Sequence, residues 1–182
     1  LEKYGGVLVG GETSSVPEGS AAVISIAATG EAPRQHLVLR SHGTVGDAIF
    51  VTGQLGGSIH GKHLNFTPRI RESQWLVSHF KPSAMMDLSD GLGKDLPRLA
   101  AASHCGFKID KNALPLTPGC TLTHAIGDGE DYEILFTITS HDSTALLATW
   151  PFHEIPLTHI GELVEVKFGE SLSGGWEHFS SV

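Results

Sequence analysis

The sequence predicts an α+β fold in which helices pack on a mixed β-sheet. Two observations carry this prediction. Short apolar runs rich in β-prone residues alternate along the chain with segments whose apolar residues recur at helical spacing. At 182 residues, the chain is also long enough to bury the core of one good-sized domain, or of one domain with a piece of another.

The first 35 residues predict two strands, over residues 5–12 and 20–30, joined by a loop of Gly, Pro and Ser. Two strands do not make a domain by themselves. The sequence has no initiator Met and begins almost at once with a strand, which is typical of a segment cut from a longer chain. We therefore expect residues 1–35 to be the end of one domain and residues 36–182 to form a second, α/β domain.

Two helices are expected early in the second domain. Between residues 68 and 80 apolar side chains recur at helical spacing, Pro68 suits the first turn and Pro82 follows the end. Residues 90–104 show the same spacing, with Pro97 inside, where a proline either kinks a helix or delays its start. The remaining elements are strands over 47–53, 106–110, 132–139 and 157–163, and a helix over 141–150.

Composition argues against several classes of protein. The formal net charge is −8 and the 12 Lys and Arg residues do not cluster, so the chain lacks the basic stripe of a nucleic-acid surface. Cys105 and Cys120 form no C-x-x-C pair, which fits plain thiols in a reducing cytoplasm. No apolar run approaches the roughly 18 to 20 residues of a membrane-spanning helix. We expect a soluble, cytoplasmic protein that binds neither nucleic acid nor membrane.

Carboxylates crowd into two short segments. Asp87, Ser89 and Asp90 fall within four residues, at the start of the second predicted helix. The other segment lies directly before an apolar, β-prone run and holds three more carboxylates, Glu130, Asp131 and Glu133. Carboxylates held this close repel one another unless a cation neutralises them, so hard divalent metal ions are natural partners. The chemistry indicated is phosphate handling.

Both clusters also have simpler explanations. Ser and Asp favour helix N-termini, so capping accounts for one of Asp87, Ser89 and Asp90, although it does not require all three. For the second cluster, the alternative is a solvated turn that leads into a strand.

Two further patterns are interpreted as carrying no function. Residues 56–62 fit the G-x-x-x-x-G-K pattern of a phosphate-binding P-loop, but His63 stands where such a loop needs Ser or Thr for Mg²⁺. His60 and His63 lack a third zinc ligand and are interpreted as surface histidines. There is also no G-x-S-x-G elbow of a serine hydrolase and no suitably positioned G-x-G-x-x-G for a dinucleotide.

Several motifs, taken in order, resemble the thiamine-monophosphate kinase family, whose superfamily also holds aminoimidazole ribonucleotide synthetase, selenophosphate synthetase and a hydrogenase maturation factor. They are Gly10-Gly11-Glu12-Thr13, Leu39-Arg40-Ser41 with Val45-Gly46-Asp47, Phe50-Val51-Thr52-Gly53, Thr67-Pro68-Arg69, Met86-Asp87-Leu88-Ser89-Asp90-Gly91-Leu92, Ile109-Asp110 with Leu114-Pro115, Gly129-Glu130-Asp131-Tyr132-Glu133, and Ile160-Gly161. These motifs span nearly the whole chain. The Asp-Leu-Ser-Asp-Gly and Gly-Glu-Asp-Tyr-Glu pair favours the kinase over its sister families.

The resemblance implies a synthetase-like C-terminal domain, preceded by the terminal strands of an N-terminal ATP-binding domain. It also implies an ATP-dependent phosphorylation of thiamine monophosphate to thiamine diphosphate. Several Mg²⁺ ions would assist, ATP would be the co-substrate, and no side chain would act as a covalent nucleophile. The N-terminal domains would pair to form a homodimer.

The same resemblance implies which residues form the site. The residues at metal-binding positions are Glu12, Asp87 and Asp90. Those at ATP-binding positions are Gly11, Glu12, Arg40 and Ser89. Glu130 would face the substrate, and Trp176 would lie over its cationic thiazolium ring. For Trp176 the alternative role is packing of the C-terminus.

The chain departs from the family pattern at three points. Glu12 replaces an Asp, Asp128 replaces a Gly, and the connector between Gly61 and Thr67 is shorter. The family's paired metal-binding aspartates and much of its ATP pocket would lie before residue 1, so we expect this chain alone to be inactive. Two interpretations stay open: the C-terminal portion of a thiamine-monophosphate kinase, and a non-catalytic nucleotide- or thiamine-phosphate-binding remnant or degenerate paralogue. A sister-family ATP enzyme fits the Gly-Glu-Asp-Tyr-Glu motif poorly.

Overall fold

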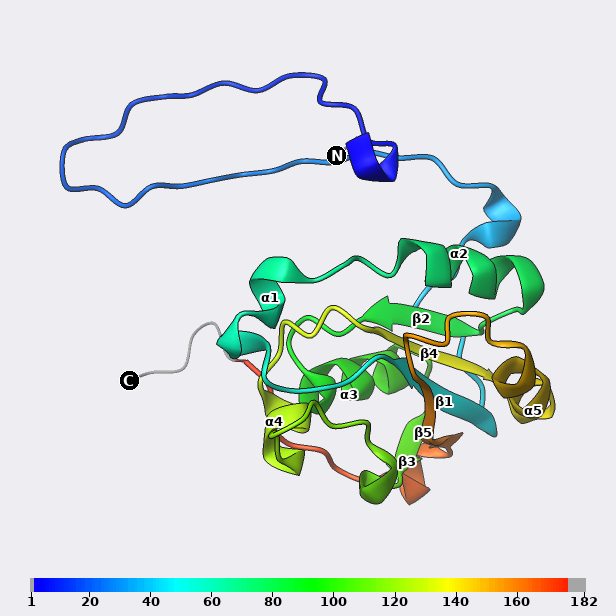
Figure 1. The fold of residues 1–182 in the computed structure, drawn as a ribbon. Helices are drawn as coiled ribbons and strands as arrows, with labels where there is room; N and C mark the ends of the chain where they lie inside the picture. The colour runs from blue at the N-terminus through cyan, green and yellow to red at the C-terminus, as the bar shows by residue number, and fades with distance from the viewer. Residues whose placement is uncertain (1, 177–182) are drawn as a thin grey trace. The chain divides into compact units, whose positions relative to one another are not determined.

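The structure, a computed structural model, describes residues 2–176, and its second unit is built on a five-stranded sheet (Figure 1). The strands follow the order β2-β4-β1-β5-β3 across the sheet. They are β1 (Asp47–Thr52), β2 (Ala84–Asp87), β3 (Gly106–Ile109), β4 (Ile134–Thr139) and β5 (Leu157–Val164). The α+β class is as predicted, but the sheet is not mixed, because neighbouring strands all pair antiparallel.

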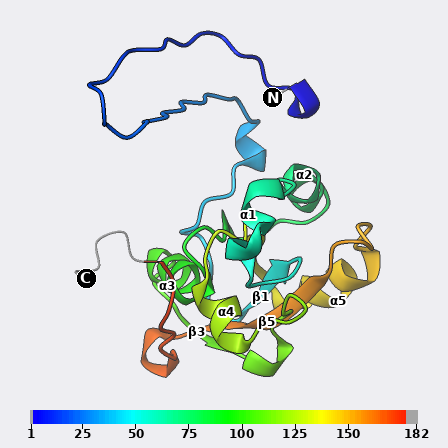
Figure 2. The same cartoon turned by 60° about the vertical axis from the view of Figure 1, so that its left-hand side comes forward.

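Helices cover both faces of this sheet (Figures 1 and 2). One face carries α2 (Ile70–His79) and α5 (Ser140–Thr149), the other carries α3 (Leu92–Ala102) and α4 (Leu122–Gly127), and α1 (Lys62–Asn65) is a single turn. The period of two along β1 produces the two layers. Ile49 and Val51 pack with the leucines of α3, whereas Phe50 packs on the opposite face.

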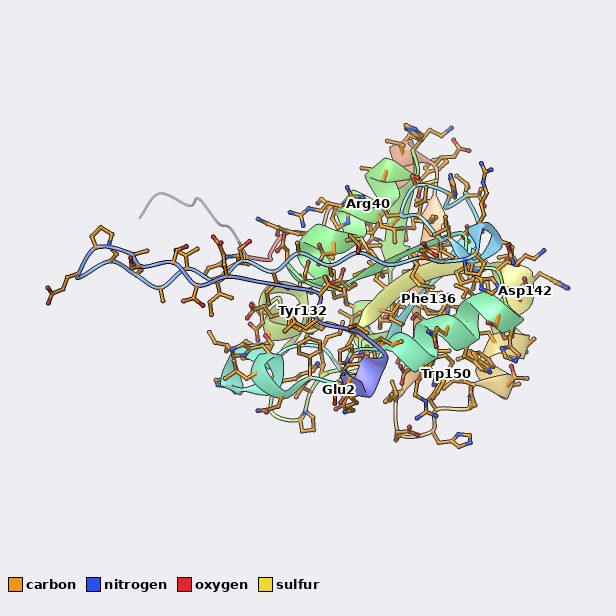
Figure 3. All side chains as sticks on the ribbon, turned by 90° about the horizontal axis from the view of Figure 1, so that it is seen from above. Glu2, Arg40, Tyr132, Phe136, Asp142 and Trp150 are labelled. Atoms are coloured by element: carbon orange, nitrogen blue, oxygen red, sulfur yellow. The ribbon has the colours of Figure 1, made fainter. Side chains whose placement is uncertain are left out.

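The core on the α2 and α5 side is aromatic. Phe50 stacks on Phe136 with ring centroids 5.5 Å apart, and Trp150 meets Trp75 edge-on at 5.5 Å. Figure 3 shows Phe136 and Trp150 beside α2. Such ring pairs stabilise the packing beyond the contribution of the apolar area that they bury, so they help to hold α2 on the sheet.

Helix α3 forms most of the core on the other face. Leu92, Leu96 and Leu99 are fully buried, as expected for one stripe of an amphipathic helix. Pro97 lies inside the helix, which begins at Leu92 and continues to Ala102, so the proline does not delay its start. The sequence patterns missed α1, α4 and β2, which have four to six residues, whereas β3, with four residues, was predicted.

The chain divides into two compact units, Leu1–Ala32 and Pro33–Val182. In the first unit, the two predicted strands over 5–12 and 20–30 are not formed, and apolar side chains such as Val9 and Ile24 are exposed. A β-strand needs a hydrogen-bonded neighbour, and these segments have none within the described part of the chain. Over residues 2–176, no helix combines the length and the apolar character needed to cross a membrane.

Candidate functional site

The two acidic motifs lie side by side because β2 and β4 are neighbours. The strands are antiparallel, so the end of β2 at Asp87 meets the start of β4 at Ile134. Past the ends of the two strands, the loop after β2 and the loop before β4 remain hydrogen-bonded to each other. The amide of Tyr132 donates to the Leu88 carbonyl at 2.9 Å, and the amide of Glu130 donates to the Ser89 carbonyl at 2.7 Å.

Glycine makes this close approach of two backbones feasible. A Cβ on Gly129 would lie 3.0 Å from the Ser89 carbonyl oxygen, and Gly129 has a φ of +70°. On the opposing loop, a Cβ on Gly91 would lie 2.9 Å from the Ile126 carbonyl oxygen. The absence of a Cβ at Gly91 and Gly129 therefore allows the backbones to pack closely, and this role of the two glycines needs no ligand.

In the loop formed by residues 129–133, two non-glycine residues with positive φ angles point their side chains differently from the other two acidic residues. Glu130 and Tyr132 both adopt the left-handed region, each with a φ of +52°. Their side chains line a pocket, whereas those of Asp131 and Glu133 are buried inside the protein. Backbone strain of this kind in non-glycine residues concentrates at functional sites.

The pocket has a volume of about 400 Å³ and collects residues from four segments of the chain. Its lining consists of Ser58, Ile59, Ser89, Asp90, Asp128, Glu130, Tyr132 and Trp176. Three carboxylates and two aromatic rings therefore line one space. This combination suits a cationic ligand.

Trp176 reaches the pocket because the C-terminal segment lies against the start of α3. The Trp176 amide donates to the Asp90 carbonyl at 2.9 Å, and the Lys94 ammonium donates to the Trp176 carbonyl at 2.7 Å. The Trp176 residue remains 58% exposed, so this ring is not packed into the core. The residues that follow Trp176 lie outside the described part of the chain.

Asp87 lines a second, mostly apolar pocket of about 540 Å³, which shares Tyr132 with the first. Tyr132 stacks on Phe66 with ring centroids 4.3 Å apart. Burial, followed by the nearby carboxylates of Glu130 and Asp87, raises the pKa of the Tyr132 phenol. The phenol therefore stays protonated at neutral pH, between two acidic side chains.

Asp131 and Glu133 are buried and have structural roles, so the alternative of a solvated turn does not hold for either of them. The Asp131 carboxylate, 1% exposed, accepts from the Gly56 amide at 2.9 Å and from Lys62 at 3.1 Å. Burial raises the pKa of Asp131 despite this ammonium. Glu133 accepts two hydrogen bonds from the Arg69 guanidinium, at 2.7 and 2.8 Å. Its carboxylate raises the pKa of Arg69 against the effect of burial.

The same contacts explain why residues 56–62 are not a P-loop. The Gly56 amide donates to Asp131 and the Gly57 amide donates to Asp128 at 2.7 Å. Lys62 contacts Asp131 as well. The amides and the ammonium that would hold a phosphate in a P-loop are thus bound to the chain's own carboxylates.

The capping explanation for the first cluster does not hold. Gly91 is the N-cap of α3, and no side chain makes a capping hydrogen bond there. Instead Asp95, which is fully buried, accepts from the amides of Ser89 and Asp90 at 3.0 and 2.9 Å. Burial raises the pKa of Asp95, opposed by the hydrogen bond from the Asp90 amide and by Arg98. Asp95 therefore fixes the loop that carries Ser89 and Asp90.

Arg40 is exposed and lines neither of these two pockets, although α3 also fixes its loop. The buried Ser103 hydroxyl at the end of α3 donates to the Arg40 carbonyl at 3.1 Å and accepts from the Gly43 amide at 3.0 Å. Figure 3 shows Arg40 and Tyr132 on separate segments. Gly11 and Glu12 belong to the first unit, where Glu12 accepts from the Ser14 hydroxyl at 3.4 Å.

Four predicted site residues therefore line one pocket, Ser89, Asp90, Glu130 and Trp176, and Asp87 lies at the next one. Within residues 2–176, no three His, Cys, Asp or Glu side chains are grouped so that they could hold a metal ion. The sequence reasoning missed Asp95 and Arg98 as partners of this loop. Their separation of three residues on a predicted helix was an available signal.

Comparison with known proteins gives these features a context. No family model matches the chain. Thiamine-monophosphate kinase of Rhodopirellula baltica is 33% identical over 174 residues, which cover 90% of this chain and 53% of that protein. A solved structure of AaThiL complexed with AMPPCP and TMP is 28% identical, with a TM-score of 0.63 over 78% of this chain and 54% of that chain.

The hydrogenase maturation protein HypE of E. coli shares the fold, with a TM-score of 0.55 at 21% identity over 71% of this chain and 47% of that chain. The chain thus spans about half the length of the relatives it matches. The α+β fold predicted from the sequence is confirmed by these likenesses. The resemblance drawn from the motifs is confirmed as well: this chain is a homologue of the thiamine-monophosphate kinases.

Proposed function

We propose that this chain is part of an enzyme that transfers the γ-phosphoryl group of ATP to thiamine monophosphate, giving thiamine diphosphate. The name of the curated relatives and the AMPPCP and TMP bound to AaThiL support this proposal. The chain spans about half of those proteins, so the activity is proposed for the complete protein. Residues 1–35 would be the end of its ATP-binding, dimer-forming domain, and residues 36–182 its second domain.

One observation carries the proposal. Ser89, Asp90, Glu130 and Trp176 come from three segments that are far apart in the sequence, and all four line the 400 Å³ pocket. The pairing of β2 with β4 brings the two acidic loops together, but it does not require these side chains to line one pocket, because the buried contacts of the loops are made by other residues, such as Asp95 and Glu133.

The chemistry of the pocket fits a cationic aromatic substrate. A thiazolium ring carries a positive charge, which is attracted by the face of Trp176 and by the Glu130 carboxylate. Tyr132 stays protonated beside the Glu130 carboxylate. No nucleophilic side chain is needed, because direct phosphoryl transfer depends on positioning and charge neutralisation.

The resemblance assigns Mg²⁺ to Glu12, Asp87 and Asp90, carboxylates of the kind that Mg²⁺ prefers, although the described residues contain no group of three that could hold a metal ion. Bound there, the metal would neutralise charge on the transferred phosphoryl group. Gly11, Arg40 and Ser89 would bind ATP, with Ser103 and Asp95 holding the loops of Arg40 and Ser89 in place.

A second candidate is a non-catalytic module that binds the same ligands. Two observations favour it: Asp90 forms an ion pair with Arg98, and the described residues contain no group of three potential metal ligands. Glu12 and Asp128, which depart from the family pattern, also favour the non-catalytic module.

The test combines turnover with binding. The complete protein that contains this chain is incubated with Mg²⁺, ATP and thiamine monophosphate, and thiamine diphosphate is measured by chromatography. Binding of thiamine monophosphate is measured in parallel by calorimetry. Product supports the kinase, and binding without product supports the module. If neither product nor binding is found, both candidates are wrong.

A matched pair of variants locates the site. Glu130→Gln removes a carboxylate from the pocket and should weaken thiamine monophosphate binding. Glu165→Gln makes the same chemical change at an exposed residue that pairs with Lys167, and should leave binding unchanged. Equal affinities for the two variants would rule out this pocket as the substrate site.

A further inference from the structure

The last described residues form a strap that runs from the edge of the sheet to the 400 Å³ pocket. This terminal strap, residues 170–176, forms neither helix nor strand. The Glu170 amide donates to a carbonyl of β3 at 2.8 Å, and Leu172 packs against the core on the α3 side of the sheet. At the other end, the Trp176 amide donates to the Asp90 carbonyl at 2.9 Å. The strap therefore brings Trp176 to a pocket whose other walls come from distant parts of the chain.

Glycines let the strap backbone lie directly on the start of α3. A Cβ on Gly93 would lie 3.0 Å from the carbonyl of Gly174. A Cβ on Gly175 would lie 2.7 Å from the Asp90 carbonyl oxygen and 2.6 Å from Cγ of Lys94, at a φ of +98°. A side chain at either position would push the strap away from the helix.

Lys94 holds the end of the strap from the first turn of α3. Its ammonium donates to the Trp176 carbonyl at 2.7 Å, and its partly buried stem runs along Gly175. A cation is unfavourable at this end of a helix, where the macrodipole is positive. The stability of α3 therefore does not explain the lysine, whereas its contact with the strap does.

The hold matters because Trp176 lines the pocket without being packed into the core. The residue is 58% exposed, so burial of its ring does not fix its place. Segments without secondary structure are mobile unless contacts tie them down. A ligand that needs the indole binds only while the strap is seated. Its apparent dissociation constant is then the intrinsic one divided by the seated fraction of the molecules.

We propose that Lys94 is a positioning residue that seats the terminal strap, so that Trp176 lines the substrate pocket, and thereby sets the affinity for the cationic ring of the substrate. Lys94 is not among the residues that line the pocket, so it acts through the Trp176 backbone. The inference rests on the proposed function, in which this pocket takes thiamine monophosphate.

Calorimetry with thiamine monophosphate, on the complete protein that contains this chain, tests the proposal. Lys94→Met keeps most of the stem and removes the ammonium. It should weaken binding roughly three- to tenfold, the range expected when one partly exposed hydrogen bond is lost. Lys94→Arg keeps a charged donor and should bind within about twofold of the wild type. Without ligand, hydrogen exchange at the Trp176 amide should become faster in Lys94→Met and not in Lys94→Arg.

Thiamine, which lacks the phosphate, separates this role from simple attraction of charge. Lys94→Met should weaken thiamine binding by the same factor, because the same Trp176 ring meets both ligands. Direct attraction between the ammonium and the phosphate would give a different result. Thiamine would then bind equally well or more tightly to Lys94→Met, because an ammonium repels a thiazolium.

A second variant displaces the strap without changing any charge. Gly175→Ala should weaken the binding of both ligands as well. Gly46→Ala is its control, because Gly46 has a φ of +92°, a Cβ there meets nothing within 4 Å, and the neighbouring Asp47 pairs with the far end of β4. Lys108→Met is the control for Lys94→Met, since it removes the same charge from an exposed residue of β3. Both controls should bind thiamine monophosphate like the wild type.

Three results would overturn the proposal. They are equal affinities of Lys94→Met and Lys108→Met, failure of Lys94→Arg to restore binding, and a loss confined to thiamine monophosphate. Should Lys94→Met fail to fold, equal affinities of Gly175→Ala and Gly46→Ala would overturn it instead. In all these cases a wild type that binds thiamine monophosphate leaves the proposed function standing. A wild type that binds neither ligand refutes the proposed function and this inference together.

Discussion

Replacement of Glu133 by Gln tests whether the acidic motif before β4 is divided into structural and functional residues. The Glu133 carboxylate, 2% exposed, accepts from Arg69 at 2.7 and 2.8 Å and from the Thr52 hydroxyl at 2.9 Å. Lys62 lies 3.8 Å away. Glu133→Gln removes the negative charge and leaves both cations without this counter-ion, while keeping the volume of the side chain.

The expected loss of stability follows from the burial of the three side chains. Removing one partner of a fully buried ion pair costs about 3–5 kcal/mol. Here the Arg69 and Lys62 side chains are 18% and 26% exposed, so water partly solvates them. The Gln carbonyl also keeps one acceptor. We therefore expect the free energy of unfolding to fall by about 2–3 kcal/mol, which lowers the Tm by roughly 4–12 °C for a domain of this size.

The assay is unfolding by urea and by heat, followed by circular dichroism, with Glu130→Gln as the control. Glu130 belongs to the same motif, but its side chain is exposed in the pocket, so its replacement should change stability by less than about 0.5 kcal/mol. If the two variants lose equal stability, or if Glu133→Gln loses less than about 0.5 kcal/mol, the assignment of a structural role to Glu133 is wrong.

Three other predictions concern single contacts. Burial raises the pKa of Asp131, so the folded state binds this proton more tightly and the free energy of unfolding should fall as pH rises above the ordinary carboxyl value of about 4. Asp131→Asn should reduce that slope in urea titrations between acidic and neutral pH, and an unchanged slope would contradict the assignment. Gly53→Ala places a Cβ 2.1 Å from a Glu133 oxygen at a φ of +63°, and should cost roughly 2–3 kcal/mol in the same unfolding assay. Ser103→Ala leaves the Gly43 amide without its acceptor, and should cost about 1–2 kcal/mol and speed hydrogen exchange at that amide; an exchange rate like that of the wild type would argue against this anchor for the Arg40 loop.

Elements long enough to show a period could be predicted from the sequence. The apolar stripe of Leu92, Leu96 and Leu99 identified α3, and the buried run from Asp47 to Thr52 identified β1. Strand β2, with four residues, shows no period, and α4 begins with a capping box formed by Thr121 and His124 in place of the usual Glu. These two elements depend on their neighbours for stability, and their local patterns did not reveal them.

The sequence also did not reveal whether neighbouring strands pair parallel or antiparallel. Alternation of strands and helices is compatible with parallel, mixed and antiparallel sheets, and only the pairing partners distinguish them. The apolar runs over 5–12 and 20–30 have the composition of strands, yet composition does not supply the hydrogen-bonded neighbour that a strand requires.

The sequence by itself determined which residues are chemically suited to the site, because motif spacing and residue type are local properties. Ser89, Asp90, Glu130 and Trp176 were identified in this way, and they line one pocket. Only the tertiary structure decided which of the crowded carboxylates face that pocket. Asp131 and Glu133 are neutralised by Lys62 and Arg69, about 70 and 60 residues earlier in the chain. Whether a carboxylate is buried and paired or exposed and available depends on such distant partners, which no local pattern contains.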